Sequence, residues 1–167
     1  MLYDARPRTM GSWTFLLREG GPKGLLAAEI HLKGFRDEGT IRVGEVPFTI
    51  DREGMGRTYR LLFEGRAMAR AEPQGALSNG YDLTVEAALL VRNLPVGEQV
   101  RFEWVPTTFG GGEYELHTDS ERIGHVKRTA MLFRHFVLTF EDVVPPAIQA
   151  FCFALVLARL RRQSRSS

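Results

Sequence analysis

Apolar and polar residues alternate along most of this chain. In residues 26–33, Leu26, Ala28, Ile30 and Leu32 share one face, and polar residues fill most of the other. This pattern is typical of antiparallel strands with one buried and one solvated face. Glycine-, proline- and asparagine-containing turns such as Ser78-Asn79-Gly80 separate the runs. Between Trp13 and Phe140 we count about eleven strand candidates, at roughly the 8–12-residue spacing of an all-β sandwich or barrel.

A weak internal repeat lies within this region. Residues 56–61 (GRTYRL) resemble residues 111–116 (GGEYEL), and each is followed by a turn and a returning strand. Both copies predict a hairpin whose outgoing strand carries Tyr-x-Leu. With two-residue turns, Leu61 would lie opposite Met68, and Leu116 opposite Ile123. Two such copies predict a pseudo-symmetric sheet.

The chain changes character after residue 142. Val143-Val144-Pro145-Pro146 ends the last strand, and proline suits the first turn of a helix. Residues 147–160 (AIQAFCFALVLARL) are apolar on every side and interrupted by Gln149 and Arg159. This run is shorter than the roughly 20 residues of a transmembrane helix, which favours a buried core helix. A helix that is apolar all round must be buried all round, and in a chain of strands that place is the inside of a closed barrel.

The predicted fold is therefore mainly β: a closed antiparallel barrel of about twelve strands around a buried hydrophobic C-terminal helix. We expect a single domain over residues 1–167, with strands at about 13–140, the central helix at about 146–161 and a basic tail at 162–167. Residues 1–11 are mixed and polar, without the apolar core of a signal peptide.

This architecture resembles the tubby C-terminal-like superfamily, which includes the tubby proteins, the phospholipid scramblases and the LURP-one-related proteins. The resemblance is carried by the two hairpins, Tyr59–Ala69 and Tyr114–Gly124, and by the closing helix Pro146–Arg161, and it covers about Trp13–Arg161. It implies a non-enzymatic module that acts at anionic phospholipid surfaces. No scramblase calcium site and no tubby head-group motif aligns with this sequence.

Composition and charge add few constraints on the function. The 167 residues carry a net charge of +2, and hydrophobic residues make up 44%. These values are those of a globular domain. The single cysteine, Cys152, excludes an internal disulfide and a cysteine-based metal cage, and lies in the predicted helix as a core residue. The chain carries no export signal and no disulfide, so we expect a reducing cytoplasmic location, with possible attachment at the inner membrane surface as a peripheral protein.

Motifs for catalysis are missing from the sequence. The histidines lack metal-ligand spacing, and the glycine clusters 54–56 and 110–112 lack the strand–loop–helix context of a phosphate loop. No serine lies in a nucleophile elbow. We therefore expect no enzyme activity, no metal site and no cofactor.

The strongest functional signal is basic. Arg122, His125, Lys127, Arg128, Arg134 and His135 are interleaved with Met131, Phe133 and Phe136, and four arginines crowd residues 159–165. The expected lipid-binding residues are Arg122, His125, Lys127, Arg128, Arg161 and Arg162, which would contact anionic head groups. For the first cluster, an ordinary solvated strand face with the aromatic residues turned into the core is the favoured interpretation. For the arginines at residues 159–165, a solubilising helix end explains the charge equally well.

The alternatives are a protein-interaction barrel and a barrel that binds a small ligand; a helix inside the lumen disfavours the second. Nucleic-acid binding is the less favoured use of the same basic residues.

Overall fold

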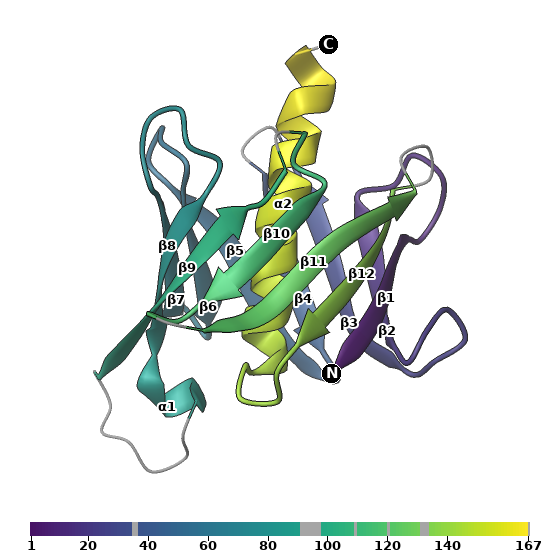
Figure 1. The fold of residues 1–167 in the computed structure, drawn as a ribbon, viewed down its shortest axis with the longest axis horizontal. Helices are drawn as coiled ribbons and strands as arrows, with labels where there is room; N and C mark the ends of the chain where they lie inside the picture. The colour runs from purple at the N-terminus through teal and green to yellow at the C-terminus, as the bar shows by residue number, and fades with distance from the viewer. Residues whose placement is uncertain (35–36, 91–97, 109, 120, 131–133, 167) are drawn as a thin grey trace.

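The computed structural model describes residues 1–34, 37–90, 98–108, 110–119, 121–130 and 134–166. Twelve antiparallel strands form a closed barrel, and a long helix runs through its centre (Figure 1). The elements in chain order are β1 (Leu2–Pro7), β2 (Thr14–Glu19), β3 (Leu26–Lys33), β4 (Glu38–Val43), β5 (Val46–Glu53), β6 (Thr58–Phe63), β7 (Arg66–Pro73), β8 (Tyr81–Glu86), α1 (Ala87–Leu90), β9 (Gln99–Pro106), β10 (Glu113–His117), β11 (Arg122–Ala130), β12 (His135–Phe140) and α2 (Pro146–Ser166).

Closure of the barrel depends on β1. Each strand pairs with its sequence neighbours, and β1 pairs with β12 as well as β2, with Ala5 opposite Phe136. The expectation that strands begin at about residue 13 was wrong at this point. Only Tyr3 and Ala5 of β1 face the core as buried apolar residues, and charged residues lie between and after them. Two alternating apolar residues within a polar segment are too few to predict a strand, and β1 is identified as one by its pairing with β12.

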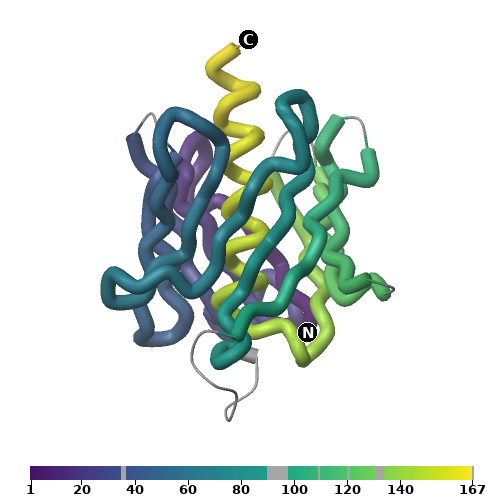
Figure 2. The backbone as a smooth tube through the Cα atoms, turned by 90° about the vertical axis from the view of Figure 1, so that its left-hand side faces the viewer, coloured from purple at the N-terminus to yellow at the C-terminus, as the bar shows by residue number. Residues whose placement is uncertain are grey.

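The helix α2 occupies the lumen. Every residue from Ala147 to Leu160 is buried, and Figure 2 shows the helix enclosed by strands from a second direction. Pro146 is its first residue, where the missing amide hydrogen costs nothing. The predicted end of the helix at about residue 161, followed by a basic tail at 162–167, was wrong. The helix α2 continues through Ser166, and its last turns emerge at one end of the barrel.

Aromatic side chains join the helix to the wall. The ring of Phe153 on α2 meets Phe15 of β2 edge-on at 5.6 Å between centroids and Phe136 of β12 at 5.1 Å. All three rings are fully buried. The inward face of the strands and the apolar surface of α2 therefore form one continuous core.

The two repeated hairpins are present, with a register that differs from the expectation. Leu61 lies opposite Ala69, and Leu116 lies opposite Gly124. The pairings of Leu61 with Met68 and Leu116 with Ile123 were wrong, because each hairpin contains a β-bulge that adds one residue to the returning strand. The bulge occurs at the same place in both copies, which strengthens the relation between them.

Truncation of Phe153 tests whether the helix is the core. We expect Phe153→Ala to lower the free energy of unfolding by about 3–5 kcal/mol, because the void between two strands and the helix cannot collapse. Urea denaturation measures this loss. The control is Leu25→Ala, since Leu25 is 81% exposed and its truncation should cost little. A chain ending at Pro145 should not fold; a cooperative, soluble fold of that chain would contradict the role assigned to α2.

Candidate functional site

One end of the barrel is strongly basic. Because the strands alternate in direction, the β1–β2, β3–β4, β5–β6, β7–β8, β9–β10 and β11–β12 connections lie at the end where α2 emerges (Figures 1 and 2). We call this the basic end. Its described basic residues in the connections and on the helix are Arg8, Arg57, Arg134, Arg159, Arg161, Arg162 and Arg165, and its described acid in the connections is Asp37.

The opposite end is acidic. Among the described residues its connections carry Glu45, Glu64, Glu98, Asp119, Glu121, Glu141 and Asp142, against the single base Lys23. The chain is nearly neutral overall, so this segregation produces a charge dipole along the barrel axis. Such a field orients the molecule toward an oppositely charged surface.

Asp37 connects the β3–β4 hairpin to the end of the helix. Its side chain is fully buried, and its backbone has a φ of 57°, which aspartate tolerates better than most residues. The guanidinium of Arg165 lies 3.4 Å from the carboxylate, and those of Arg161 and Arg162 lie 3.8 Å away. Burial raises the pKa of Asp37 more than these arginines lower it. A single carboxylate therefore faces three guanidinium charges.

The tyrosines of the two repeats hold two helix arginines. Arg159 donates to the hydroxyl of Tyr114 at 2.5 Å, and Arg162 donates to that of Tyr59 at 2.5 Å. Arg162 also reaches the hydroxyl of Tyr81 at 3.4 Å. Burial raises the pKa of Tyr59 to about 12 and also raises that of Tyr114. Both phenols therefore stay neutral at physiological pH and accept hydrogen bonds without cancelling the arginine charge.

Gly111 makes room for Arg159. A side chain at Gly111 would begin 2.2 Å from one guanidinium nitrogen of Arg159, and the glycine has a φ of 68°. The glycine cluster 110–112 thus includes a turn residue against which a buried guanidinium lies. The absence of a side chain at this turn position leaves space for the guanidinium.

A second group of arginines surrounds Trp13. The guanidinium carbons of Arg134 and Arg161 lie 4.8 and 5.6 Å from the centre of the Trp13 ring. Arg128 of β11 lies 6.0 Å from the Phe136 ring. Arg128 and Arg134, with Trp13, line a cavity of about 440 Å³ beside the helix. These cation–π contacts hold the arginines at the rim of the barrel.

The expected lipid-binding residues fall into two groups. Arg128, Arg161 and Arg162 lie at the basic end. Arg122, His125 and Lys127 lie along the outer wall, where Arg122 pairs with Glu115 at 2.9 Å and Lys127 pairs with Glu113 at 3.0 Å. His125 is half-buried, opposite Glu115 in the register. The neighbouring strand thus supplies acids that neutralise the wall cluster. Met131 and Phe133, expected beside it, lie outside the described residues.

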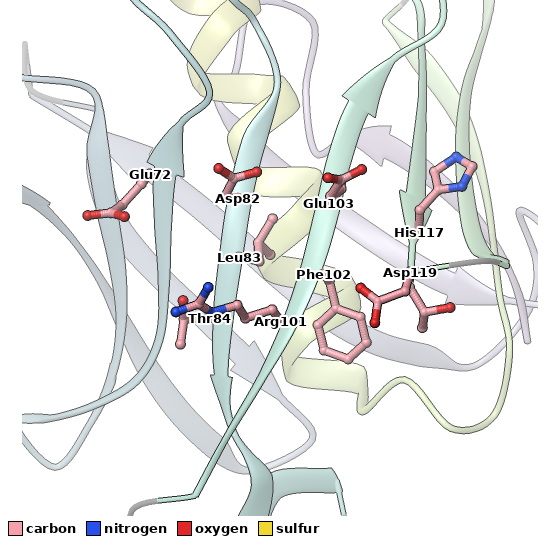
Figure 3. Close-up of a pocket in the computed structure, with 10 residues that line it drawn as sticks. Glu72, Asp82, Leu83, Thr84, Arg101, Phe102, Glu103, His117 and Asp119 are labelled. Carbon is pink, nitrogen blue, oxygen red and sulfur yellow. The ribbon is translucent and has the colours of Figure 1, made fainter.

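A pocket with several acidic residues lies on the outer wall, and it reaches the basic end through Glu72 and Asp82, which lie next to the β7–β8 connection. Glu72, Asp82 and Glu103 stand opposite one another across β7, β8 and β9, and His117 of β10 continues the row (Figure 3). The pocket has a volume of about 340 Å³. No three of the described His, Cys, Asp or Glu side chains are arranged to share a metal ion. Like charges opposite one another in a sheet repel, so this pocket disfavours an anion.

Cys152 lies in the middle of α2 and is fully buried. Burial strongly raises the pKa of its thiol. Because the thiolate is the reactive form, this cysteine acts as a core residue.

Sequence reasoning missed Arg57, Asp37 and the three tyrosines as parts of one site. They come from separate strands and connections, and only the closed barrel brings them to the end of α2.

Among the described residues, no helix has both the length and the apolar character needed to cross a membrane. No protein-family model matches the chain, and no curated protein matches it in sequence.

Substitution of Gly111 tests the contact with Arg159. We expect Gly111→Ala and Gly44→Ala each to lower the free energy of unfolding by about 1–2 kcal/mol, because each places a side chain at a positive φ. Gly44 has a φ of 57° and open space at its Cβ position, so it is a matched control. Gly111→Ala should cost about 1.5–3 kcal/mol more, because the buried guanidinium must leave Tyr114. Urea denaturation compares the two variants. Equal losses would mean that the guanidinium moves aside freely.

Proposed function

We propose that this protein is a non-enzymatic binding module that attaches to anionic phospholipid membranes through its basic end. The observation that carries the proposal is the separation of charge between the two ends of the barrel. Several arginines at the basic end share one buried acid, whereas the wall cluster is paired locally. A basic segment near an anionic bilayer contributes about 1 kcal/mol of binding free energy per Lys or Arg.

We further propose that the barrel is of the tubby-like kind. The closed twelve-stranded barrel, the helix through its lumen and the repeated bulged hairpins support this assignment. In that setting the protein would be cytoplasmic and peripheral at the inner membrane surface. The filled lumen disfavours a carrier that holds a small ligand inside the barrel, and a protein partner with an acidic surface is the remaining alternative.

Liposome flotation tests the membrane proposal. Purified protein is mixed with neutral, phosphatidylserine or phosphoinositide vesicles at low and high salt. We expect binding to the anionic vesicles only, weaker at high salt. The double variant Arg8→Gln/Arg134→Gln removes two charges at the basic end that form no ion pair with a carboxylate of the described residues. It should weaken binding by about 2 kcal/mol, roughly thirty-fold.

The matched control is Arg122→Gln/Lys127→Gln, which removes the same charge from the outer wall. We expect it to bind nearly as the unmodified protein does, because each residue is already paired with a glutamate. Equal losses of vesicle binding in the two double variants would show that binding depends on net charge and not on the basic end. Failure to bind any vesicle would exclude the membrane and favour the acidic protein partner.

A further inference from the structure

A pocket at the basic end collects guanidinium groups from two parts of the chain. It lies between the end of α2 and the β5–β6 and β7–β8 connections, and its volume is about 500 Å³. The lining residues are Arg57, Asn79, Arg159, Arg162, Gln163 and Ser166. Every charged residue in this lining is an arginine.

Arg57 is held in the pocket by neutral backbone groups. It donates to the carbonyl oxygens of Ser78, Gly75 and Ala76 at 2.7, 2.9 and 2.7 Å. Carbonyl groups position a guanidinium but carry no net charge. No carboxylate within the described part of the chain forms an ion pair with Arg57. These bonds also use only some of the five N–H groups of the side chain, so donors remain for a ligand.

Arg159 is the stronger indication that this pocket takes an anion. Its side chain is only 6% exposed, its Nε has no hydrogen-bond partner, and the described residues offer it no ion-pairing carboxylate. Among the described residues, its hydrogen-bond acceptor is the neutral hydroxyl of Tyr114. An arginine does not lose its proton, and a buried charge is costly unless it is paired. A ligand with negative charge would supply the partner.

Arg162 adds a third positive charge that is only partly compensated. Asp37 lies 3.8 Å from Arg162, and it also faces Arg161 and Arg165. The hydroxyls of Tyr59 and Tyr81 fix the direction of the Arg162 guanidinium. Nearby Asn79 and Ser166 provide neutral polar groups in the lining.

We propose that this pocket binds a phosphomonoester. Three guanidinium charges with N–H groups left to donate match a compact dianion better than they match a flat or singly charged ligand. The volume accommodates a phosphate and the group attached to it. This inference deepens the proposed function and rests on it where the phosphomonoester belongs to a lipid; a free phosphomonoester has the same chemistry.

Calorimetric titration with inorganic phosphate and with glycerol 3-phosphate tests the pocket without a membrane. We expect saturable binding of both at constant ionic strength. Arg57→Gln should weaken it about ten-fold, the loss of one charge-assisted contact. Arg57→Lys keeps the charge but loses the planar guanidinium that the three carbonyls position, and its affinity should lie between those of the unmodified protein and Arg57→Gln. Arg122→Gln, on the outer wall, should leave binding unchanged. Arg159→Gln should also weaken binding, and Arg57→Gln remains informative if that variant does not fold.

Vesicles separate the lipid source from the free one. Phosphatidic acid ends in a phosphomonoester, whereas phosphatidylglycerol has only a phosphodiester. At matched surface charge we expect tighter binding to phosphatidic acid, with the difference lost in Arg57→Gln. Binding of the soluble phosphates without vesicle binding would keep the pocket, assign it to a free ligand and reject the membrane proposal. Equal binding to both lipids with no response to soluble phosphate would overturn the pocket and leave the membrane proposal intact.

Discussion

The lumen of the barrel has to be filled, and the rest of the structure depends on how α2 fills it. A sheet closed into a twelve-stranded barrel turns one face of every strand inward, and only an element that is apolar on all sides can occupy that space. The buried segment Ala147–Leu160 meets this requirement. Phe153 shows the coupling directly, because its ring contacts both β2 and β12 and so joins the two sides of the β1 closure.

Filling the lumen also determines where the charges of the helix are placed. The apolar part of α2 ends near Leu160, and the arginines that follow emerge among six strand connections. Their positive charges interact favourably with the negative, C-terminal end of the helix dipole. Asp37 and the tyrosines of the two repeats hold these arginines in fixed directions. The helix end thus becomes an ordered part of the basic end, where a tail without structure would have left the charges dispersed.

Stability and binding are linked at the basic end. Burying Arg159 without an acid carries an energetic cost, and the compact core of the barrel is what makes that cost tolerable. Gly111 contributes by leaving space for the guanidinium. If an anion binds here as proposed, the fixed geometry of these positive charges reduces the ordering that binding requires.

The alternation of residues and the uniformly apolar C-terminal segment were enough to predict a closed barrel around a central helix. They could not predict β1, whose few inward residues lie within a polar segment, or the bulges that shift Leu61 and Leu116, because register depends on pairing across the sheet. For the site, the arginines of the helix were visible as a cluster. Arg57, Asp37 and the tyrosines became its neighbours only through barrel closure, which brings distant strand ends together. The sequence determined the fold class because one arrangement, a closed barrel around the helix, buries both the apolar faces of the strands and every side of the apolar C-terminal segment. The tertiary structure decided which charges are paired, as with Arg122 and Glu115, and which have no carboxylate partner among the described residues, as with Arg159, because that depends on distances between residues far apart in the chain.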